Sequence, residues 1–251
     1  TSSTLSVNSF TIDTTGPALS VVIPVPAISS DNTSSYTFSS NEPGAITYSG
    51  GCESTTTSAV ADNNTIEFNA LADDNYSNCK VTVTDNLSNA SSLSVNTFKI
   101  DTTDPIVTEV TAVTTPGNDT TPSYTFHSTE PGDITYGGSC SSSDNSTSSS
   151  GNKSIDFRKP NGAVLDEGSY GTGTCTIRVT DGAGNPSNRL DVSSFIIDTT
   201  APTVDSVYPA NNQNGVSITT DNISVTFSEA MDSNSVTTNT TNSRCSGSLP
   251  L

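Results

Sequence analysis

The sequence has no tryptophan, one methionine, one histidine and no run of 18 or more apolar residues. Without such a run we expect no membrane insertion within this segment. Only eight lysines and arginines stand against 26 aspartates and glutamates, which gives a formal net charge of −18. Nucleic-acid phosphates need a basic footprint, so we expect no nucleic acid among the partners. A chain this acidic suits a saline surrounding or bound divalent cations, which cancel part of its self-repulsion.

The most informative stretch that is present, Phe-x-Ile-Asp-Thr-Thr, occurs three times and begins at residues 10, 98 and 195. A proline follows each copy two residues later. A long period of this kind indicates a repeated domain. Because the chain opens inside a repeat, we expect it to be a segment of a longer protein. We predict the last strand of a preceding repeat, two complete repeats and a partial domain, at residues 1–13, 14–101, 102–198 and 199–251.

The two complete repeats align with one another over most of their length. Both contain a Glu-Pro-Gly motif, at residues 42–44 and 130–132, and the second repeat has eight extra residues between its two cysteines. Short runs of alternating apolar residues, separated by Gly, Pro, Asn and Asp, indicate strands. Six or seven such strands in about 90 residues predict an immunoglobulin-like (Ig-like) β-sandwich. The strands are expected near residues 18–25, 34–40, 44–49, 64–70, 79–85 and 92–100, and near 106–113, 122–128, 133–137, 153–158, 174–180 and 189–197.

The predicted fold class is therefore all-β, with tandem Ig-like sandwiches in a linear array. Tyr76 and Tyr170 each stand at the start of the penultimate strand, shortly before a cysteine. This placement is typical of a tyrosine corner, although an ordinary half-buried tyrosine is the alternative. The inward positions of the first repeat are predicted to be Tyr36, Phe38, Ile46, Tyr48, Ile66, Phe68, Val81 and Val83.

The motifs resemble a known family. Asp-Thr-Thr-x-Pro linkers, Glu-Pro-Gly and Val-Thr-Asp-x-x-x-Asn resemble the tandem bacterial Ig-like repeats of large surface proteins and adhesins. Residues 225–232, Val-Thr-Phe-Ser-Glu-Ala-Met-Asp, are similar to the Ig-like domain of S-layer proteins. The resemblance covers essentially the whole chain and implies an extracellular location or the bacterial cell surface. It specifies function poorly, because such modules serve as stalks, spacers, adhesin tips and enzyme appendages.

The cysteines suit one disulfide in each repeat. In an Ig topology Cys52 lies just past the third strand and Cys79 opens the penultimate strand, and these strands are neighbours in one sheet. Cys140 and Cys175 match them in the second repeat. Each bridge would add about 2–4 kcal/mol and would require an oxidising compartment; free thiols in a reducing cytosol are the alternative. Cys245 is left over, and we expect its partner to lie beyond the end of this sequence.

Acidic and amide side chains are predicted to meet at each junction between domains. The incoming linker and two loops of a sandwich lie at one pole, and Ca²⁺ takes six to eight oxygen ligands from carboxylates, amides and backbone carbonyls. Related repeats resemble cadherins in using Ca²⁺ to stiffen the joint. The alternative is that these residues only cap turns. The predicted ligands are Asp13, Glu42, Asp85 and Asn89 at the first junction, Asp101, Asp104, Glu130, Asp181 and Asn185 at the second, and Asp198 and Glu229 at the third.

The sequence gives little support for catalysis. His127, the only histidine, is next to Phe126 in a predicted strand. Because Phe126 faces inward, His127 is expected to point outward, and the first repeat has Ser39 at the matching position. No Ser/His/Asp set recurs and no Gly-rich loop joins a strand to a helix, so we expect no enzyme.

The main functional expectation is a stalk or spacer that touches only neighbouring repeats and extends a tip domain. One alternative is an adhesin that binds a host or glycan ligand through the insertion Ser141–Ser150. The other is self-assembly into a filament, in which the N-terminal strand Leu5–Ile12 completes the unclosed third unit of a neighbouring copy.

Overall fold

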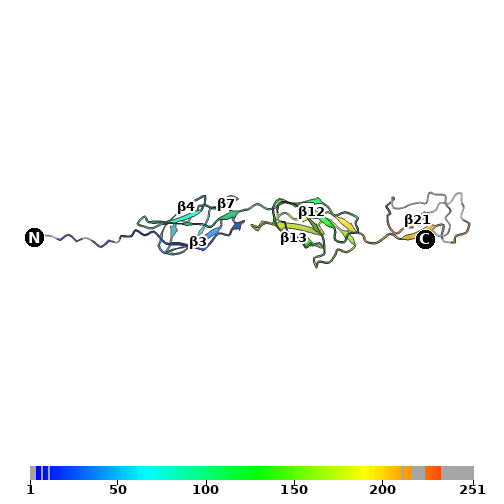
Figure 1. Ribbon diagram of the computed structural model, residues 1–251, viewed down its shortest axis with the longest axis horizontal. Coiled ribbons are helices and arrows are strands. Elements are labelled where there is room, and N and C mark those ends of the chain that lie inside the picture. The colour runs from blue at the N-terminus through cyan, green and yellow to red at the C-terminus, as the bar shows by residue number, and fades with distance from the viewer. Residues whose placement is uncertain are drawn as a thin grey trace. The chain divides into compact units, whose positions relative to one another are not determined.

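The computed structural model describes residues 4–6, 8–10, 12–147, 149–210, 212–215 and 224–232. All regular secondary structure in these ranges is β, which confirms the predicted fold class (Figure 1). The chain divides into two compact units, Thr1–Ile197 and Asp198–Leu251. The predicted tail, with Cys245, lies outside the described residues. Residues 4–6, 8–10 and 12 form no strand, since a strand in a sandwich needs a sheet edge to pair with.

The first repeat forms three small sheets with the strand orders β1-β3-β6, β5-β4-β8-β9 and β2-β10-β7. Neighbouring strands are antiparallel except β2 and β10, which are parallel. The strands are β1 Leu19–Ile23, β2 Ile28–Ser29, β3 Ser35–Ser40, β4 Gly44–Ser49, β5 Ser58–Ala59, β6 Asp62–Glu67, β7 Asp74–Tyr76, β8 Lys80–Thr84, β9 Ala90–Ser94 and β10 Phe98–Ile100.

The second repeat has the corresponding orders β11-β12-β15, β14-β13-β17-β18 and β16-β19. A parallel bridge between Gly117 and Ile197 stands where the first repeat has β2. Ser146–Thr147, within the predicted insertion, pairs with β13 as a short edge strand. The strands are β11 Val107–Thr111, β12 Ser123–Ser128, β13 Gly132–Gly138, β14 Ser146–Thr147, β15 Gly151–Asp156, β16 Gly168–Tyr170, β17 Cys175–Thr180, β18 Leu190–Asp191 and β19 Phe195–Ile197.

In the C-terminal unit the structure describes one antiparallel pair, β20 Val204–Tyr208 and β21 Ser224–Phe227. Both strands lie within residues 199–251, the predicted partial domain. Their side chains are mostly exposed.

Each repeat has its own hydrophobic core. Tyr36, Phe38 and Ile66 are fully buried in the first repeat, and Tyr124 and Phe126 are fully buried in the second. They come from every second position of a strand, as the alternation of the sequence predicts. The other predicted inward residues of the first repeat are buried too, except the half-buried Tyr48.

The prediction of a single last strand at 92–100 is wrong. The chain leaves β9, which pairs with β8, and enters β10, which pairs with β7 and β2 in another sheet. The apolar spacing reflects this change, because Leu93 and Val95 are two apart but Phe98 follows after three. The predicted strand at 189–197 divides in the same way into β18 and β19. The prediction also missed β2, β5, β7, β14 and β16, which have only two or three residues each and are too short to show a period.

The disulfides are confirmed. Tyr76 and Tyr170 make the backbone hydrogen bond of a tyrosine corner, but each ends a strand of another sheet, β7 or β16, and does not open the penultimate strand. Cys52 is bonded to Cys79 and Cys140 to Cys175, with Cα–Cα distances of 5.5 and 5.0 Å. Each bridge joins the end of one strand to the start of its antiparallel neighbour, β4 to β8 and β13 to β17. The Tyr76 hydroxyl donates to the Ala72 carbonyl at 3.0 Å, and Tyr170 makes the same bond to a carbonyl four residues upstream at 3.1 Å.

Candidate metal sites at the repeat junctions

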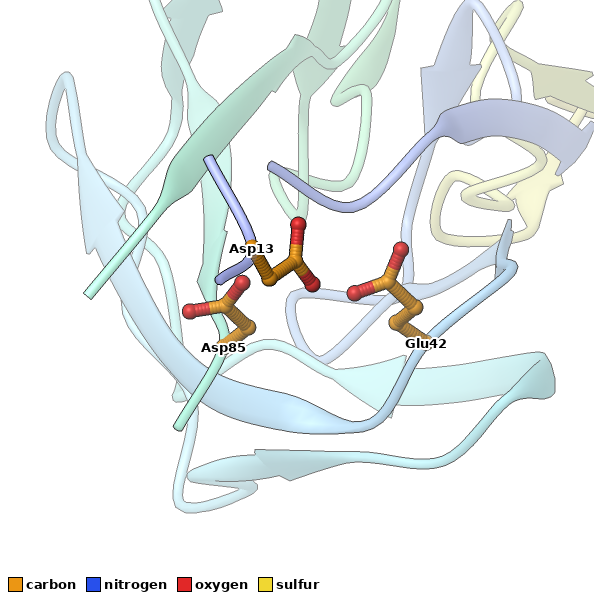
Figure 2. Close-up of side chains that lie close together, drawn as sticks. All are labelled: Asp13, Glu42 and Asp85. Atoms are coloured by element: carbon orange, nitrogen blue, oxygen red, sulfur yellow. The ribbon is translucent and has the colours of Figure 1, made fainter. Parts of the chain in front are cut away.

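Three carboxylates meet at the N-terminal pole of the first repeat. Asp13 precedes β1, Glu42 lies between β3 and β4, and Asp85 follows β8. One oxygen of each lies within 4.8 Å of one oxygen of the other two. Asp13 and Glu42 are half-buried, and Asp85 exposes only 9% of its surface. Figure 2 shows the three side chains turned toward a common space. The structure therefore brings together three of the four ligands predicted for this junction.

The Glu-Pro-Gly motif is needed to place Glu42. The Ser40 hydroxyl donates to the Glu42 carbonyl at 2.6 Å and holds the turn after β3. A Cβ on Gly44 would lie 2.5 Å from the Thr84 carbonyl oxygen, so only glycine allows β4 to begin this close to β8. The same close approach occurs at Gly132 in the second repeat.

Asp85 also caps its own loop. Its Oδ1 accepts hydrogen bonds from the backbone N–H groups of Leu87 and Asn89, both at 2.8 Å, and its Oδ2 accepts one from the Asn89 side chain at 2.9 Å. Led by the Asn89 side chain, these bonds hold the pKa of Asp85 below its usual value. The Asn89 amide also donates to the Asp13 carbonyl at 3.2 Å, so the loop is tied to the incoming linker. The turn-capping interpretation is therefore correct for Asp85.

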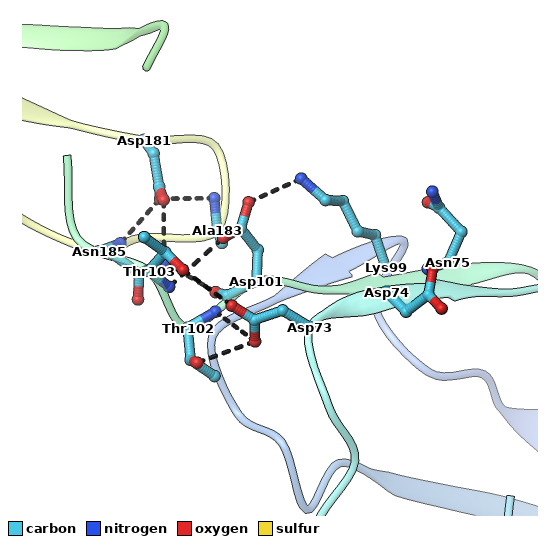
Figure 3. A network of polar contacts seen from close by, with 10 residues as sticks. All are labelled: Asp73, Asp74, Asn75, Lys99, Asp101, Thr102, Thr103, Asp181, Ala183 and Asn185. Atoms are coloured by element: carbon cyan, nitrogen blue, oxygen red, sulfur yellow. Dashed lines mark hydrogen bonds and ion pairs between the residues drawn. The ribbon is translucent and has the colours of Figure 1, made fainter. Parts of the chain in front are cut away.

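The second junction repeats this arrangement. Oxygens of Asp101, Glu130 and Asp181 lie within 4.8 Å of one another, and Asp101 is buried. Asp181 accepts hydrogen bonds from its own loop, and the Asn185 amide donates to the Asp101 carbonyl at 2.7 Å (Figure 3). The linker that leaves the first repeat is thus bonded directly to a loop of the second.

The negative charge of the three carboxylates at the second junction is only partly balanced by a nearby lysine. Burial raises the pKa of Glu130, and the negative charges of Asp101 and Asp181 raise it further. The Lys99 ammonium lies 2.7 Å from Asp101 Oδ2 and offsets part of this repulsion. The first junction has Thr11 at the matching sequence position, which lies outside the described residues.

Asp73 is a junction residue that sequence reasoning missed. It precedes β7, and its carboxylate accepts hydrogen bonds from the Thr102 backbone N–H at 3.0 Å, the Thr102 hydroxyl at 2.8 Å and the Thr103 hydroxyl at 2.9 Å (Figure 3). The Thr102 hydroxyl is the main cause of the lowered pKa of Asp73. This contact explains the two threonines that follow Asp101, and the repeated Asp-Thr-Thr motif was the signal available in the sequence. The acceptor itself, 29 residues earlier in the chain, had no marker in the sequence.

The other predicted ligands lie differently. Asp104 is exposed and stands outside the second cluster. Asn89 and Asn185 turn their amide nitrogen atoms toward the linker carbonyls, which leaves only their Oδ1 atoms as ligands. Asp198 and Glu229 belong to the second compact unit. Among the described residues no third group of three acidic side chains converges.

The chemistry of both clusters fits a hard cation. Three carboxylates, each binding through one or two oxygens, supply about half or more of the six to eight ligands that Ca²⁺ takes, and water or an asparagine Oδ1 can complete the set. No cysteine or histidine belongs to either cluster, which argues against zinc.

Residues 198–249 match the family model described as a bacterial Ig-like domain. The chain therefore contains a bacterial Ig-like domain. The match lies where the sequence resembles the Ig-like domain of S-layer proteins. A solved structure of the fibronectin(III)-like modules of Clostridium thermocellum CbhA is similar at 12% identity, over 72% of this chain and 94% of that chain, with a TM-score of 0.36. No curated protein matches the chain.

Bacterial Ig-like domains are usually structural modules found outside the cell or at its surface, and they are typically non-catalytic. No helix in the described part of the chain has the length and apolar character required to cross a bilayer.

Proposed function

We propose that this chain is a spacer of a bacterial cell-surface or secreted protein, which holds a tip domain away from its anchor and is stiffened by Ca²⁺ at its junctions. The observation that carries the proposal is that the linker between the two repeats is hydrogen-bonded to both of them. Asp101 donates its N–H to the Ser29 carbonyl of its own repeat at 3.0 Å and accepts from Asn185 of the next repeat through its carbonyl. Both repeats therefore bind the same linker residue.

The rest of the linker is bound as well. Asp73 holds Thr102 and Thr103 to the first repeat, and Pro105, two residues after Thr103, is buried. A free linker would leave these backbone and hydroxyl groups to water. A linker bound on both sides loses much of its conformational freedom, which is what a spacer of defined reach requires.

A cation would strengthen the linker's connection to the second repeat. Asp101 comes from the linker, and Glu130 and Asp181 come from two loops of that repeat. Without an ion their like charges oppose close approach, and the charges of Asp101 and Asp181 add to the effect of burial in raising the pKa of Glu130. Ca²⁺ bound by the three carboxylates would replace this repulsion with attraction and join the linker to both loops. The cluster of Asp13, Glu42 and Asp85 would do the same for the segment that enters the first repeat.

The test is calorimetry and small-angle scattering of the full chain in EDTA and in Ca²⁺. We expect Ca²⁺ to raise the melting temperature and to narrow the range of distances between the repeats. Glu130→Gln should weaken both effects, whereas the matched control Glu67→Gln, which removes an exposed charge outside the clusters, should not.

An unchanged melting temperature and scattering curve on Ca²⁺ addition would exclude the calcium part of the proposal. A scattering curve of two freely moving repeats, even in Ca²⁺, would exclude the spacer itself.

The filament alternative has one favourable observation. Leu5, Phe10 and Ile12 expose 92%, 75% and 77% of their surface, which is unusual for large apolar side chains close together in sequence. Removal of residues 1–13 followed by electron microscopy would test whether they mediate assembly. Polymers that depend on this segment would favour the filament, and monomers at high concentration would exclude it.

A further inference from the structure

Most of the eight extra residues of the second repeat lie in one loop. Asn69 and Arg158 occupy equivalent places before the loop, and Leu71 and Leu165 do so after it, because the N–H groups of each pair donate to matching carbonyls. The first repeat has a single residue between these places, and the second has six, Lys159–Val164. Six residues against one account for five of the eight.

The segment Ser141–Ser150, in which we expected an adhesin to bind its ligand, is not where the two repeats differ most. Its strand β14 matches β5 of the first repeat, and both pair with the preceding strand at equivalent positions. The surface feature that distinguishes the second repeat is therefore the Lys159–Val164 loop.

This loop has a defined shape, because it is closed by its own hydrogen bonds. The Lys159 N–H donates to the Ala163 carbonyl, and the Gly162 N–H donates to the Lys159 carbonyl, both at 2.8 Å. The side-chain oxygen of Asn161 accepts from the Ala163 N–H at 3.0 Å. Gly162 has a φ of 83°, which glycine adopts without steric cost. Residues 160–164 are all exposed, so the loop is an ordered part of the surface.

A polar cavity of about 470 Å³ lies beside the loop, and this volume is within the range of about 300–1,000 Å³ of small-molecule sites. The Lys159 Nζ pairs with Asp166 Oδ1 at 2.6 Å, and the Asp166 side chain remains 77% exposed, so its carboxylate can accept further bonds from a ligand. The Tyr170 ring is stacked on Phe195, with 4.7 Å between the ring centroids, which holds it in place. The lining residues are Ser139, Lys159, Pro160, Asn161, Asp166 and Tyr170.

The polar side chains of this cavity are special to the second repeat. The first repeat has Gly51 at the position of Ser139 and Ala72 at the position of Asp166. Ala70 stands there in place of the whole loop, and only the tyrosine is common to both repeats. Because the first repeat forms the same fold without these groups, the fold does not require them.

We propose that this cavity is a binding site for a neutral carbohydrate. A sugar hydroxyl both donates and accepts hydrogen bonds, whereas Lys159 only donates and the Asp166 carboxylate only accepts, so the pair suits two neighbouring hydroxyls of one sugar ring. The rings of Pro160 and Tyr170 offer apolar surface to the C–H groups of the sugar. The Lys159–Asp166 pair is neutral overall, and the chain's net charge of −18 disfavours an acidic ligand. The site goes beyond the spacer role and does not depend on it.

The test is binding of the full chain to an array of immobilised neutral oligosaccharides that end in glucose, galactose, mannose or N-acetylglucosamine, with sialylated and sulfated glycans on the same array. We expect retention on at least one neutral glycan. Asp166→Ala should weaken this binding roughly tenfold or more, because it removes the acceptor. The variant should still fold, since the first repeat has an alanine here and keeps the hydrogen bond from its tyrosine to the same backbone carbonyl.

Asp144→Ala is the matched control. Asp144 forms an ion pair with Lys153 of the same repeat at 2.9 Å, and neither residue lines the cavity. This variant should leave glycan binding unchanged. Replacement of the Lys159–Val164 loop by a single alanine, as in the first repeat, should abolish binding.

The proposal would be overturned if no neutral glycan retained the chain, or if Asp166→Ala bound as well as the unmodified chain. Stronger retention on the sialylated or sulfated glycans would show that the ligand is an anion and would exclude a neutral sugar. None of these outcomes affects the spacer proposal, because that proposal depends on scattering and melting rather than on glycan binding.

Discussion

The two repeats differ most clearly at one buried hydroxyl. Tyr124 of the second repeat donates to Glu109 Oε2 at 3.0 Å, whereas the hydroxyl of Tyr36, its counterpart, has no partner among the described residues. The reason is the facing strand, where the first repeat has Val21 at the position of Glu109. A buried hydroxyl without a partner costs about 1–3 kcal/mol. The shared fold therefore tolerates an unpaired buried hydroxyl in the first repeat, whereas the second repeat provides a hydrogen-bond acceptor for it.

Glu109 does more than satisfy the tyrosine, because it also binds Ser193 near the end of the repeat. The first repeat has no acid at this place and links its ends through Asn96 instead. The comparison shows that the link between first and last strands is kept while the residues that make it change. Stability measured separately for each repeat, by hydrogen exchange of its core amides, can test this view.

Removal of the disulfides should have the largest effect and should be the same in both repeats. We expect Cys52→Ala with Cys79→Ala to lower the opening free energy of the first repeat by about 2–4 kcal/mol, and the matching pair to do the same in the second. The loops enclose 27 and 35 residues, and the entropic term grows only with the logarithm of that number. A loss in one repeat more than about 1 kcal/mol larger than in the other would show that the bridges are not equivalent.

Glu109→Val should make the second repeat resemble the first. Tyr124 and Ser193 then lose their common acceptor, and we expect a loss of roughly 2 kcal/mol in the second repeat alone. Val21→Glu in the first repeat is the reciprocal variant, and it should recover part of this energy if its carboxylate reaches Tyr36. If Glu109→Val leaves the stability of the second repeat unchanged, the hydrogen bonds to Glu109 do not account for the difference between the repeats.

The Glu109 interaction should also depend on pH. Burial raises the pKa of Glu109, but the hydrogen bonds from Ser193 and Tyr124 outweigh it, and the pKa lies below the usual 4.5. A group with a lowered pKa in the folded state stabilises above its unfolded pKa, and this contribution is lost as the pH falls through the folded value. The difference between wild type and Glu109→Gln should therefore shrink below about pH 4. A difference that is constant down to pH 2 would exclude an ionised role.

The tyrosine pair isolates the hydroxyl itself. Tyr124→Phe should cost roughly 1–2 kcal/mol, because Glu109 loses a donor, whereas Tyr36→Phe should be neutral or stabilise by up to about 1 kcal/mol, because it removes an unpaired group. Each variant is the control for the other, as both delete one oxygen from a fully buried ring. Equal losses would mean that Tyr36 has a partner after all.

Much of this structure follows from local patterns in the sequence. Period-two alternation predicted the buried apolar residues of β3, β6 and β8, and the repeated motifs predicted the three acidic residues that converge at each of the first two junctions, but also Asp104, which lies outside the cluster. The pairing of the cysteines followed from the expected topology. Each of these features depends on the spacing of residues along the chain or on matching positions in the two repeats. The sequence shows both the spacing and the matches directly.

What could not be predicted depends on contacts between distant segments. Nothing near Asp73 marks it as the acceptor for Thr102, and nothing near Val25 marks it as the partner of Asn96. The unpaired hydroxyl of Tyr36 follows from a valine on another strand. To predict such a contact, the relative positions of two distant segments must be known. A period or a motif, by contrast, can be recognised within one segment.

The smallest expected effect concerns the two acidic clusters, which differ in a nearby cation. Lys99 pairs with Asp101 at the second junction, and Thr11 stands at its position before the first. If Ca²⁺ binds there, the ammonium competes with it, so Lys99→Thr should tighten Ca²⁺ binding at the second junction. Lys99 is 45% exposed, so the effect is modest, roughly threefold in affinity by calorimetric titration. Lys80→Thr is the control, because it removes the same charge at the start of β8, and Lys80, unlike Lys99, is not among the charges that act on Glu130 of the second cluster. An equal gain from Lys80→Thr would show that only net charge matters, and no gain from Lys99→Thr would mean that its ammonium does not compete for the site.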